Sequence, residues 1–265
     1  MLIGALAQNG TYIFVCPISG RGGEHGVFVG LWRAAQQGGN KLTLIEGPAG
    51  VGKTRRVEEI IRYAEIDGAT VLRGRCYEFG SAVPYQAIGE ALQGTLGPNA
   101  GVYSGSCPLD SLDPVWLAEL TRLLPALRQL RSELAYPEPA IGDTSRQRLF
   151  QAAAHFLLAL GKCVLLIDDL QGADQATFDF PHYLVHQIAE APVWPVGTYR
   201  LKEIGSGHPL TRLRQGLSRD HLVDHIELGS LSLQVVNDLV SSSMGEEGRA
   251  WDTISKARAR GILSS

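Results

Sequence analysis

The sequence predicts an α/β fold in which short apolar strands alternate with helices along one sheet. Two observations carry this prediction. Residues 42–45 form an apolar run that leads directly into the spacing G-x-x-x-x-G-K-T, after which the pattern becomes helical. Residues 163–167 form a second apolar run, which ends in the adjacent acids Asp168 and Asp169. With 265 residues, the chain has room for one large domain of this kind and a small appendage.

The glycine-rich motif after the first of these runs is a phosphate-binding loop. A triphosphate must come within hydrogen-bond distance of several backbone N–H groups, and a side chain at Gly50 or Gly52 would block that approach. The helix that begins near Lys53 adds its unpaired N–H groups and the positive end of its dipole. The residues expected to contact the nucleotide are Gly47, Pro48, Ala49, Gly50, Val51, Gly52, Lys53 and Thr54.

Polar side chains near this loop have the chemistry that a nucleotide needs. Lys53 would contact the β and γ phosphates as a point charge, and the Thr54 hydroxyl would ligate Mg²⁺. A carboxylate that ends a buried strand is costly unless a cation meets it, so Asp168 is expected to hold the metal through water. Asp169 would orient or deprotonate the attacking water. The alternative is that the two acids simply begin a turn before a helix at 173–188.

Arginines follow two further strands of the predicted sheet. A strand at 194–199 ends in Arg200, which in a parallel sheet emerges at the same carboxyl edge as Asp168. Arg200 is therefore expected to contact the γ-phosphate, and the alternative is a strand-end arginine that lies in solvent or pairs with a local acid. Arg73 and Arg75 follow the second strand, and for them a place near the nucleotide and a place in solvent both stay open.

The rest of the chain alternates between helical and extended patterns. Further helices are expected at about 31–37, 54–65, 85–92, 114–134, 145–160, 209–217 and 232–242, and further strands at 12–16, 70–72 and 225–228. The segment 114–134 carries an apolar stripe of leucines that is interrupted at Pro125, a pattern typical of core packing. Residues 1–27 are expected to form a flexible leader because they include a glycine-rich stretch with no chemical motif.

Composition excludes several classes of protein. Hydrophobic residues make up 45% and charged residues 19% of the chain, and the formal net charge is -3, so neither disorder nor a global attraction to nucleic acid is expected. Cys16, Cys76, Cys107 and Cys163 are scattered, which is typical of reduced thiols and indicates a cytoplasmic protein. The sequence contains no basic signal-peptide start and no run approaching eighteen apolar residues, so no membrane contact is expected.

Three motifs together resemble the signal-transduction ATPases of the STAND class within the AAA-like P-loop ATPases. The similarity is greatest to the ATPase module of large LuxR-type transcriptional regulators and of some multidomain cyclases. The motifs are Gly47 to Thr54, Leu165 to Asp169 and Gly197 to Arg200, with support from residues 28–30, 73–77, 84–86, 166–171 and 208–213. The likeness covers about residues 28–243.

This resemblance implies a three-layer P-loop NTPase core, in which a five-stranded, mostly parallel sheet has helices on both faces. The strand of Asp168 is expected far from the loop strand, because the family inserts it there. ATP with Mg²⁺ is the implied cofactor, Arg200 is the implied γ-phosphate contact, and adenine contacts are implied near Val29. A switch of this class self-associates through its ATPase domain or opens when the nucleotide is exchanged.

The sequence also departs from the family pattern at several positions. The family usually has Gly-Arg-Glu after the leading Val, whereas here Gly30 is followed by Leu-Trp-Arg, and Gly172 stands where a tryptophan commonly follows Gln171. Nothing after Gly245 matches the helical lid of the family. The expected organisation is therefore a leader at 1–27, an ATPase domain at 28–245 and a tail at 246–265 without a lid.

The function expected from these motifs is an ATP-binding and slowly hydrolysing switch module of a multidomain regulator. Hydrolysis is expected to be slow because Asp169 stands where fast AAA motors usually carry glutamate, whose side chain is one methylene longer. The alternative is a DNA-associated ATPase of the origin-recognition or helicase-loader type. That function needs a basic surface, and 24 basic against 27 acidic residues do not predict direct DNA contact. A nucleotide-free interaction fragment and a small-molecule kinase are further alternatives.

Overall fold

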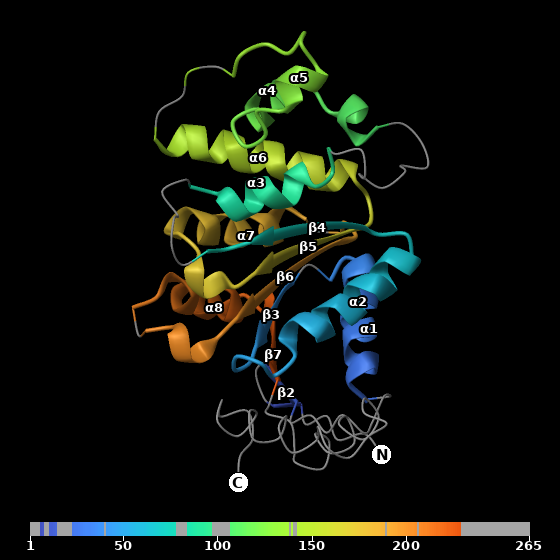
Figure 1. Cartoon of the computed structure of the whole chain (residues 1–265), viewed down its shortest axis with the longest axis vertical. Helices are drawn as coiled ribbons and strands as arrows, with labels where there is room; N and C mark the ends of the chain where they lie inside the picture. Colours follow the sequence, from blue (N-terminus) through green and yellow to red (C-terminus); the bar gives the residue numbers. More distant parts are fainter. Residues whose placement is uncertain are drawn as a thin grey trace, which may run out of the picture.

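The computed structural model describes residues 6–7, 11–14, 23–39, 41–77, 84–96, 107–137, 139, 142–188, 190–205 and 207–228. One sheet runs through this part of the chain, with the strand order β1-β2-β7-β3-β6-β5-β4 (Figure 1). Its strands are β1 Leu6–Ala7, β2 Thr11–Phe14, β3 Leu42–Glu46, β4 Thr70–Arg75, β5 Cys163–Asp168, β6 Val193–Tyr199 and β7 Val223–Leu228.

The five strands from β7 to β4 are all parallel to their neighbours. The predicted α/β class with a five-stranded parallel core is thereby confirmed. β2 adds a further parallel strand beside β7, and β1 pairs with β2 in the antiparallel direction at the edge. The loop strand β3 lies between β7 and β6, so β6 separates it from β5.

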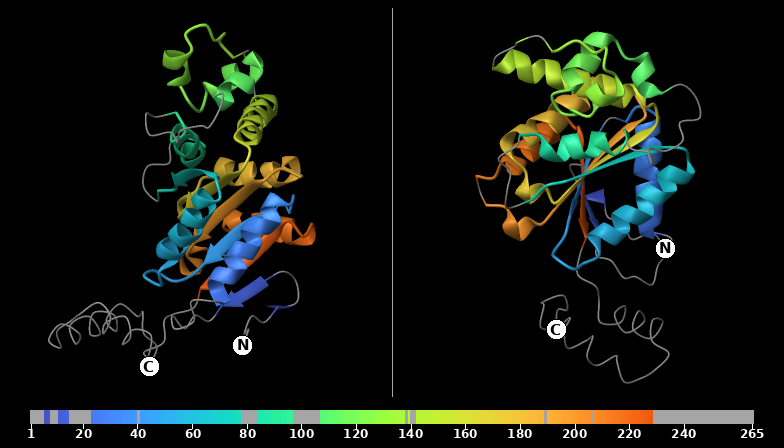
Figure 2. Two further views of the ribbon diagram at one scale, coloured as in Figure 1. Left: turned by 90° about the vertical axis from the view of Figure 1, so that its right-hand side faces the viewer. Right: turned by 45° about the horizontal axis from the view of Figure 1, so that its top comes forward.

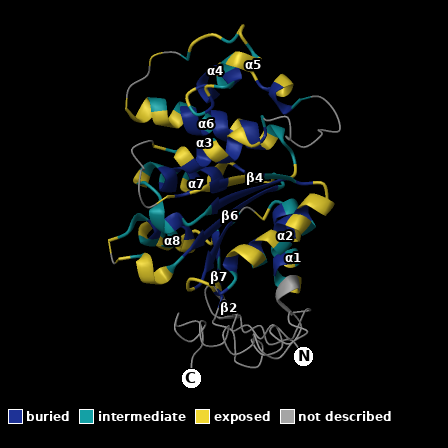
Figure 3. Cartoon of the chain, in the orientation of Figure 1, coloured by how far each residue is buried: buried dark blue, intermediate teal, exposed yellow. Residues whose placement is uncertain are grey.

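Helices cover both faces of the sheet and complete three layers. The helices are α1 Gly23–Gln36, α2 Lys53–Ile66, α3 Gln86–Gln93, α4 Pro114–Leu120, α5 Leu127–Leu130, α6 Asp143–Ala159, α7 Gln175–Gln187 and α8 Pro209–Arg219. α1 and α2 pack on one face, while α3, α6, α7 and α8 pack on the other (Figures 1 and 2). Each face has its own apolar core, and Figure 3 shows the buried strands between outer helix surfaces that are exposed.

The segment 114–134, expected as one helix interrupted at Pro125, contains two short helices. α4 ends at Leu120 and α5 begins at Leu127, because proline has no N–H for the helical ladder and its ring clashes with the preceding turn. The pair lies outside α6 (Figure 1). Four leucines of the predicted stripe are buried, whereas Leu123 is only partly buried and Leu130 is exposed. The buried members are Leu117, Leu120, Leu124 and Leu127.

α1 begins earlier than its sequence pattern suggests. The pattern predicts a helix at 31–37, yet α1 starts at Gly23, so residues 23–27 belong to it and not to a leader. β2 likewise lies within the stretch expected as a leader, where it pairs with β7. Glycine is a poor helix former, so the glycines in this segment do not predict the first turns of α1. Burial of Phe28 and Trp32 against the sheet stabilises the helix nonetheless.

Some expectations fall outside the described residues. These are the helix at 232–242, the tail at 246–265 and the question of a lid. Among the helices that the structure describes, none has the length and apolar character needed to cross a membrane.

Two buried thiols give a test of this packing. Cys76 and Cys163 are buried, and burial raises the pKa of each thiol to about 12. Because the thiolate fraction falls about tenfold per pKa unit, iodoacetamide at pH 8 should alkylate both at least about 100-fold more slowly than the half-buried Cys107. Peptide mass spectrometry of the native protein measures the three rates. Equal rates at Cys163 and Cys107 would contradict the packing described here.

Candidate active site

The phosphate-binding loop connects the end of β3 to the start of α2. Gly50 and Gly52 have φ angles of 78° and 94°, in the left-handed region that side chains disfavour. Gly52 is also the N-cap of α2, and as a glycine it supplies no side-chain hydrogen bond to the first turn. Pro48, Ala49 and Gly50 are exposed. The loop therefore presents backbone N–H groups and a helix N-terminus to solvent, as anion binding requires.

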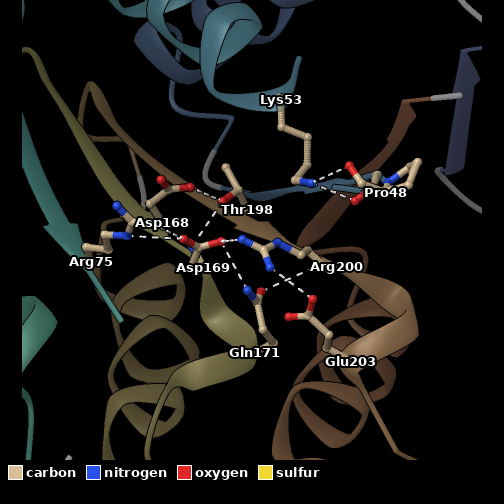
Figure 4. Close-up of polar contacts among 10 residues, drawn as sticks. Pro48, Lys53, Arg75, Asp168, Asp169, Gln171, Thr198, Arg200 and Glu203 are labelled. Atoms are coloured by element: carbon tan, nitrogen blue, oxygen red, sulfur yellow. Dashed lines mark hydrogen bonds and ion pairs between the residues drawn. The ribbon is translucent and has the colours of Figure 1, made fainter. Parts of the chain in front are cut away.

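Lys53 is the buried cation of this loop. Its side chain folds back so that Nζ donates hydrogen bonds to the carbonyl oxygens of Gly47, at 2.6 Å, and Pro48, at 2.9 Å (Figure 4). Burial lowers its pKa, and the charge of Arg200 lowers it further, while Asp169 and other acids raise it in part. Thr54 follows on the exposed side of α2. A phosphate would offer the Lys53 ammonium anionic acceptors in place of two neutral carbonyls.

Asp168 ends β5 and lies on the face of the sheet that α2 covers. Its Oδ1 accepts a hydrogen bond from the hydroxyl of Thr198, and the same hydroxyl accepts a hydrogen bond from the backbone N–H of Asp169 at 3.1 Å. Thr198 is fully buried near the end of β6. β6, which lies between β5 and β3, thus holds both acids in place through Thr198.

Asp169 is surrounded by donors from three directions. Its Oδ2 accepts hydrogen bonds from Arg75 Nε at 3.1 Å and Nη2 at 2.8 Å, and its Oδ1 accepts one from Gln171 Nε2 at 3.0 Å. Arg200 Nη2 lies 3.5 Å from Oδ1. Burial raises the pKa of Asp169, but the hydrogen bonds from Gln171 and Arg75 and the charge of Arg200 outweigh it, so the net shift is downward. The carboxylate is ionised and a weak base.

Arg200 connects the acids to the segment that follows β6. Its Nη1 donates to Glu203 at 2.9 Å, and its backbone N–H donates to Gln171 Oε1 at 3.2 Å. Gln171 therefore bridges Asp169 and the backbone of Arg200 (Figure 4). Glu203 ends the short 3₁₀ helix η3, Leu201–Glu203. The guanidinium is held between two carboxylates.

The structure thus brings most of the predicted site residues to one edge of the sheet. Lys53, Asp168, Asp169 and Arg200 interact electrostatically across a shared space (Figure 4). Val29 lies inside α1, where its backbone N–H and carbonyl belong to the helical ladder, so only its side chain would be left to contact adenine. Its role stays a prediction.

Three residues of the site have no role that the sequence alone assigns. Thr198 lies in a fully buried strand and carries no charge. Its hydrogen bond to Asp168 therefore cannot be predicted from the sequence pattern of the strand. Gln171 belongs only to a supporting motif of the family. For Arg75 the sequence allows both the nucleotide side and solvent, and the structure joins it to Asp169. The sequence feature that could have indicated Arg75 is its position: it follows an apolar strand and therefore lies at the same edge of the sheet as the acids.

The sequence that forms this site matches a known protein family. The family model described as AAA ATPase domain matches residues 17–196, which include the phosphate-binding loop and the two acids. The chain belongs to the AAA ATPase domain family. No curated protein sequence matches this AAA ATPase domain.

Solved structures of low similarity also match. C. elegans PCH-2 is 14% identical with a TM-score of 0.40, and the match covers 83% of this chain and 45% of that chain. Drosophila ORC bound to GC-rich DNA and Cdc6 is 13% identical with a TM-score of 0.37, covering 91% and 81%. The genome packaging NTPase B204 of Sulfolobus turreted icosahedral virus 2, in complex with ATP-gammaS, is 13% identical with a TM-score of 0.29, covering 69% and 84%. At such distances these likenesses say nothing of what this chain binds.

Proposed function

We propose that this AAA ATPase domain binds ATP with Mg²⁺, hydrolyses it slowly and serves as a signal-transduction switch of the STAND class, like the module of large LuxR-type transcriptional regulators. The observation that carries the proposal is the meeting of the loop lysine Lys53 with the acids Asp168 and Asp169 and with Arg200 at one edge of the sheet. The proposed domain covers residues 28–245, and α1 and β2 extend it toward the N-terminus. We place it in a cytoplasmic protein, because the free thiols of Cys76 and Cys163 support a reducing compartment.

The oxygen donors at this edge fit a magnesium ion. Asp168 supplies a carboxylate that Thr198 orients, and Thr54 supplies an exposed hydroxyl at the start of α2. Among the described residues no three His, Cys, Asp or Glu side chains gather into a metal cage. Mg²⁺ usually needs only one or two protein carboxylates because nucleotide phosphates and water supply the rest. When bound with ATP, it would neutralise charge on the phosphate oxygens.

In the proposed reaction, water attacks the γ-phosphorus, the bond from that phosphorus to the bridging oxygen of ADP breaks, and Asp169 takes the proton of the water. Lys53 stabilises the charge on the phosphate oxygens, and Arg200 contacts the γ-phosphate. Slow turnover follows from the contacts of Asp169. Its carboxylate is already bonded to Arg75 and Gln171, which lower its basicity and compete with the water for its oxygens.

The same contacts support a switch. Arg200 forms an ion pair with Asp169 on one side and donates a hydrogen bond to Glu203 in η3 on the other. A γ-phosphate that attracts this guanidinium would weaken both contacts and free η3, while its loss on hydrolysis would restore them. The state of η3 would then report the nucleotide to a partner surface, which we take to be a second copy of the domain.

Thermal unfolding tests the nucleotide site. ATP with Mg²⁺ at about 100 times its Kd should stabilise the wild-type protein by about 2.7 kcal/mol, which for a domain of this size raises Tm by about 5 °C or more. Lys53→Ala should abolish the rise, since the buried ammonium is the cation of the loop. Lys162→Ala is the matched control, because Lys162 pairs with Asp67 at the other end of β5, and it should keep the full shift.

The control outcomes separate the candidate functions. Equal Tm shifts in wild type and Lys53→Ala would refute the assignment of the site. A salt-dependent binding titration with duplex DNA addresses the origin-recognition or helicase-loader alternative, because neutralised phosphates make affinity fall steeply with salt. Specific, salt-dependent DNA binding would favour that alternative over the switch.

A further inference from the structure

A buried polar cluster lies beneath the proposed nucleotide site, on the opposite face of the sheet. It joins the ends of β3 and β6 to β7. The hydroxyl of Tyr199 donates to Glu46 Oε2 at 2.6 Å, and His225 Nε2 lies 3.0 Å from the same oxygen. Arg214 of α8 donates to the Tyr199 hydroxyl at 3.4 Å. Glu46 is 7% exposed and Tyr199 is 1% exposed, so water cannot substitute for these contacts.

The cluster keeps a charge inside the core. Burial raises the pKa of Glu46, but the hydrogen bonds from His225 and Tyr199, together with the positive charge of Arg214, produce a net decrease. Burial and the carboxylate raise the pKa of Tyr199, so its hydroxyl keeps the proton that it donates. Apolar side chains would pack at this place without such a cost. Stability alone therefore does not account for a buried carboxylate that is hydrogen-bonded to a tyrosine here.

The position of the pair in the chain indicates what it does. Glu46 and Tyr199 are direct partners in the register of β3 and β6. Glu46 immediately precedes Gly47, the first residue of the phosphate-binding loop, and Tyr199 immediately precedes Arg200. One hydrogen bond therefore joins the two chain segments that would hold the phosphates from opposite sides.

The base of the loop is also fixed by packing. A Cβ at Gly47 would lie 2.9 Å from Val51 Cγ1 and 3.1 Å from the carbonyl oxygen of Leu228, so the backbone sits directly against the end of β7. Consecutive residues of β6 point to opposite faces of the sheet. Thr198 bonds to Asp168 on the nucleotide face, and Tyr199 bonds to Glu46 on the other. The end of β6 is thus bonded both to the strand of the acids and to the strand of the loop.

We infer that Glu46 and Tyr199 are positioning residues for hydrolysis: their hydrogen bond fixes the phosphate-binding loop relative to Arg200 and the two acids. This inference rests on the proposed ATPase function and assigns it two further residues. ATP binding uses mainly one continuous segment, residues 47–54, so it tolerates a small shift between strands. Hydrolysis requires the γ-phosphate held by that segment to meet groups carried by β5 and β6, so it does not tolerate the shift.

The experiment separates affinity from the chemical step in the full chain. Tyr199→Phe and Glu46→Gln should each leave the Kd for ATP with Mg²⁺ within about twofold of wild type. Each should lower the single-turnover rate constant of hydrolysis about tenfold, since small misplacements of reacting groups cost this much or more. The double variant should be no slower than the slower single variant, because both changes remove one shared interaction. Tyr183→Phe, on α7 beside Phe150, is the matched control and should match wild type.

The results that would overturn the inference differ from those that would overturn the proposed function. If wild type binds and hydrolyses ATP but Tyr199→Phe turns over at the wild-type rate, the inference is wrong and the function stands. An equal loss of affinity and rate, or additive losses in the double variant, likewise assigns the pair a purely structural role. If wild type neither binds nor hydrolyses ATP, the proposed function fails and the inference fails with it. Two chemically different single variants keep the test decisive if one of them does not fold.

Discussion

Replacing Asp169 by asparagine should lower the single-turnover rate constant of ATP hydrolysis by about 100-fold or more, because the amide cannot accept the proton of the attacking water. The backbone should tolerate the change. Asp169 has a φ of 57°, a left-handed conformation that asparagine adopts readily. The amide oxygen can still accept a hydrogen bond from Arg75, so the site keeps its shape. Rapid mixing of excess enzyme with ATP measures the rate constant.

The control for this variant is Asp179→Asn. Asp179 is an acid on α7 that pairs with Arg146 and has no part in the proposed reaction, so its loss should leave hydrolysis unchanged. The affinity of Asp169→Asn for ATP should stay close to that of wild type, since the proposed binding contacts are on the loop. A reduction in rate below about threefold, far under the usual range for general bases, would remove Asp169 from the role of base.

Replacing Gly74 by alanine should lower the free energy of unfolding by about 3 kcal/mol, near the upper end for overpacked cores. Gly74 is the next-to-last residue of β4, where α3 packs on the strand. A Cβ there would lie 1.8 Å from the carbonyl oxygen of Ala87, a backbone atom that cannot rotate away. The helix would have to move off the sheet, and the contacts of Arg75 with Asp169 would move with β4. Urea unfolding measures the change.

Gly30→Ala provides a control of opposite sign. Gly30 lies on the exposed side of α1, and a Cβ there would meet no atom within 4 Å. Alanine is favoured over glycine inside helices by about 0.5–1 kcal/mol, so this variant should be slightly more stable than wild type. If both substitutions proved neutral, the close packing of α3 on β4 would be wrong.

The sequence was most informative where chemistry requires a residue type at a fixed spacing. The loop containing Lys53 needs glycines and a helix start, and the acids Asp168 and Asp169 at the end of an apolar run are costly unless a cation meets them. Parallel strands bring their carboxyl ends to one edge, so the meeting of these groups with Arg200 could be anticipated. The number of strands in the parallel core was implied by the resemblance to AAA-like P-loop ATPases and not by the alternation of strands and helices itself.

Other features depend on tertiary contacts that no local pattern encodes. Thr198 and Tyr199 are ordinary strand residues until the register of β6 sets them beside Asp168 and Glu46. The start of α1 at Gly23 is hidden by glycine propensity, and the pairing of β2 with β7 joins residues about 200 positions apart. Such long-range pairings follow from the assembled sheet and not from the sequence around either strand.

The strand order has a consequence for folding during synthesis on the ribosome. The phosphate-binding loop is synthesised early, but the two strands that flank β3 end at Tyr199 and Leu228, roughly 150 and 180 residues later. At about 5–20 residues per second, the loop is present for on the order of 10 to 30 s before the strands that flank β3 have been synthesised. Until β7 has been synthesised, β3 lacks one of its two neighbouring strands, so the sheet around the loop can assemble only when nearly all of the described chain is present.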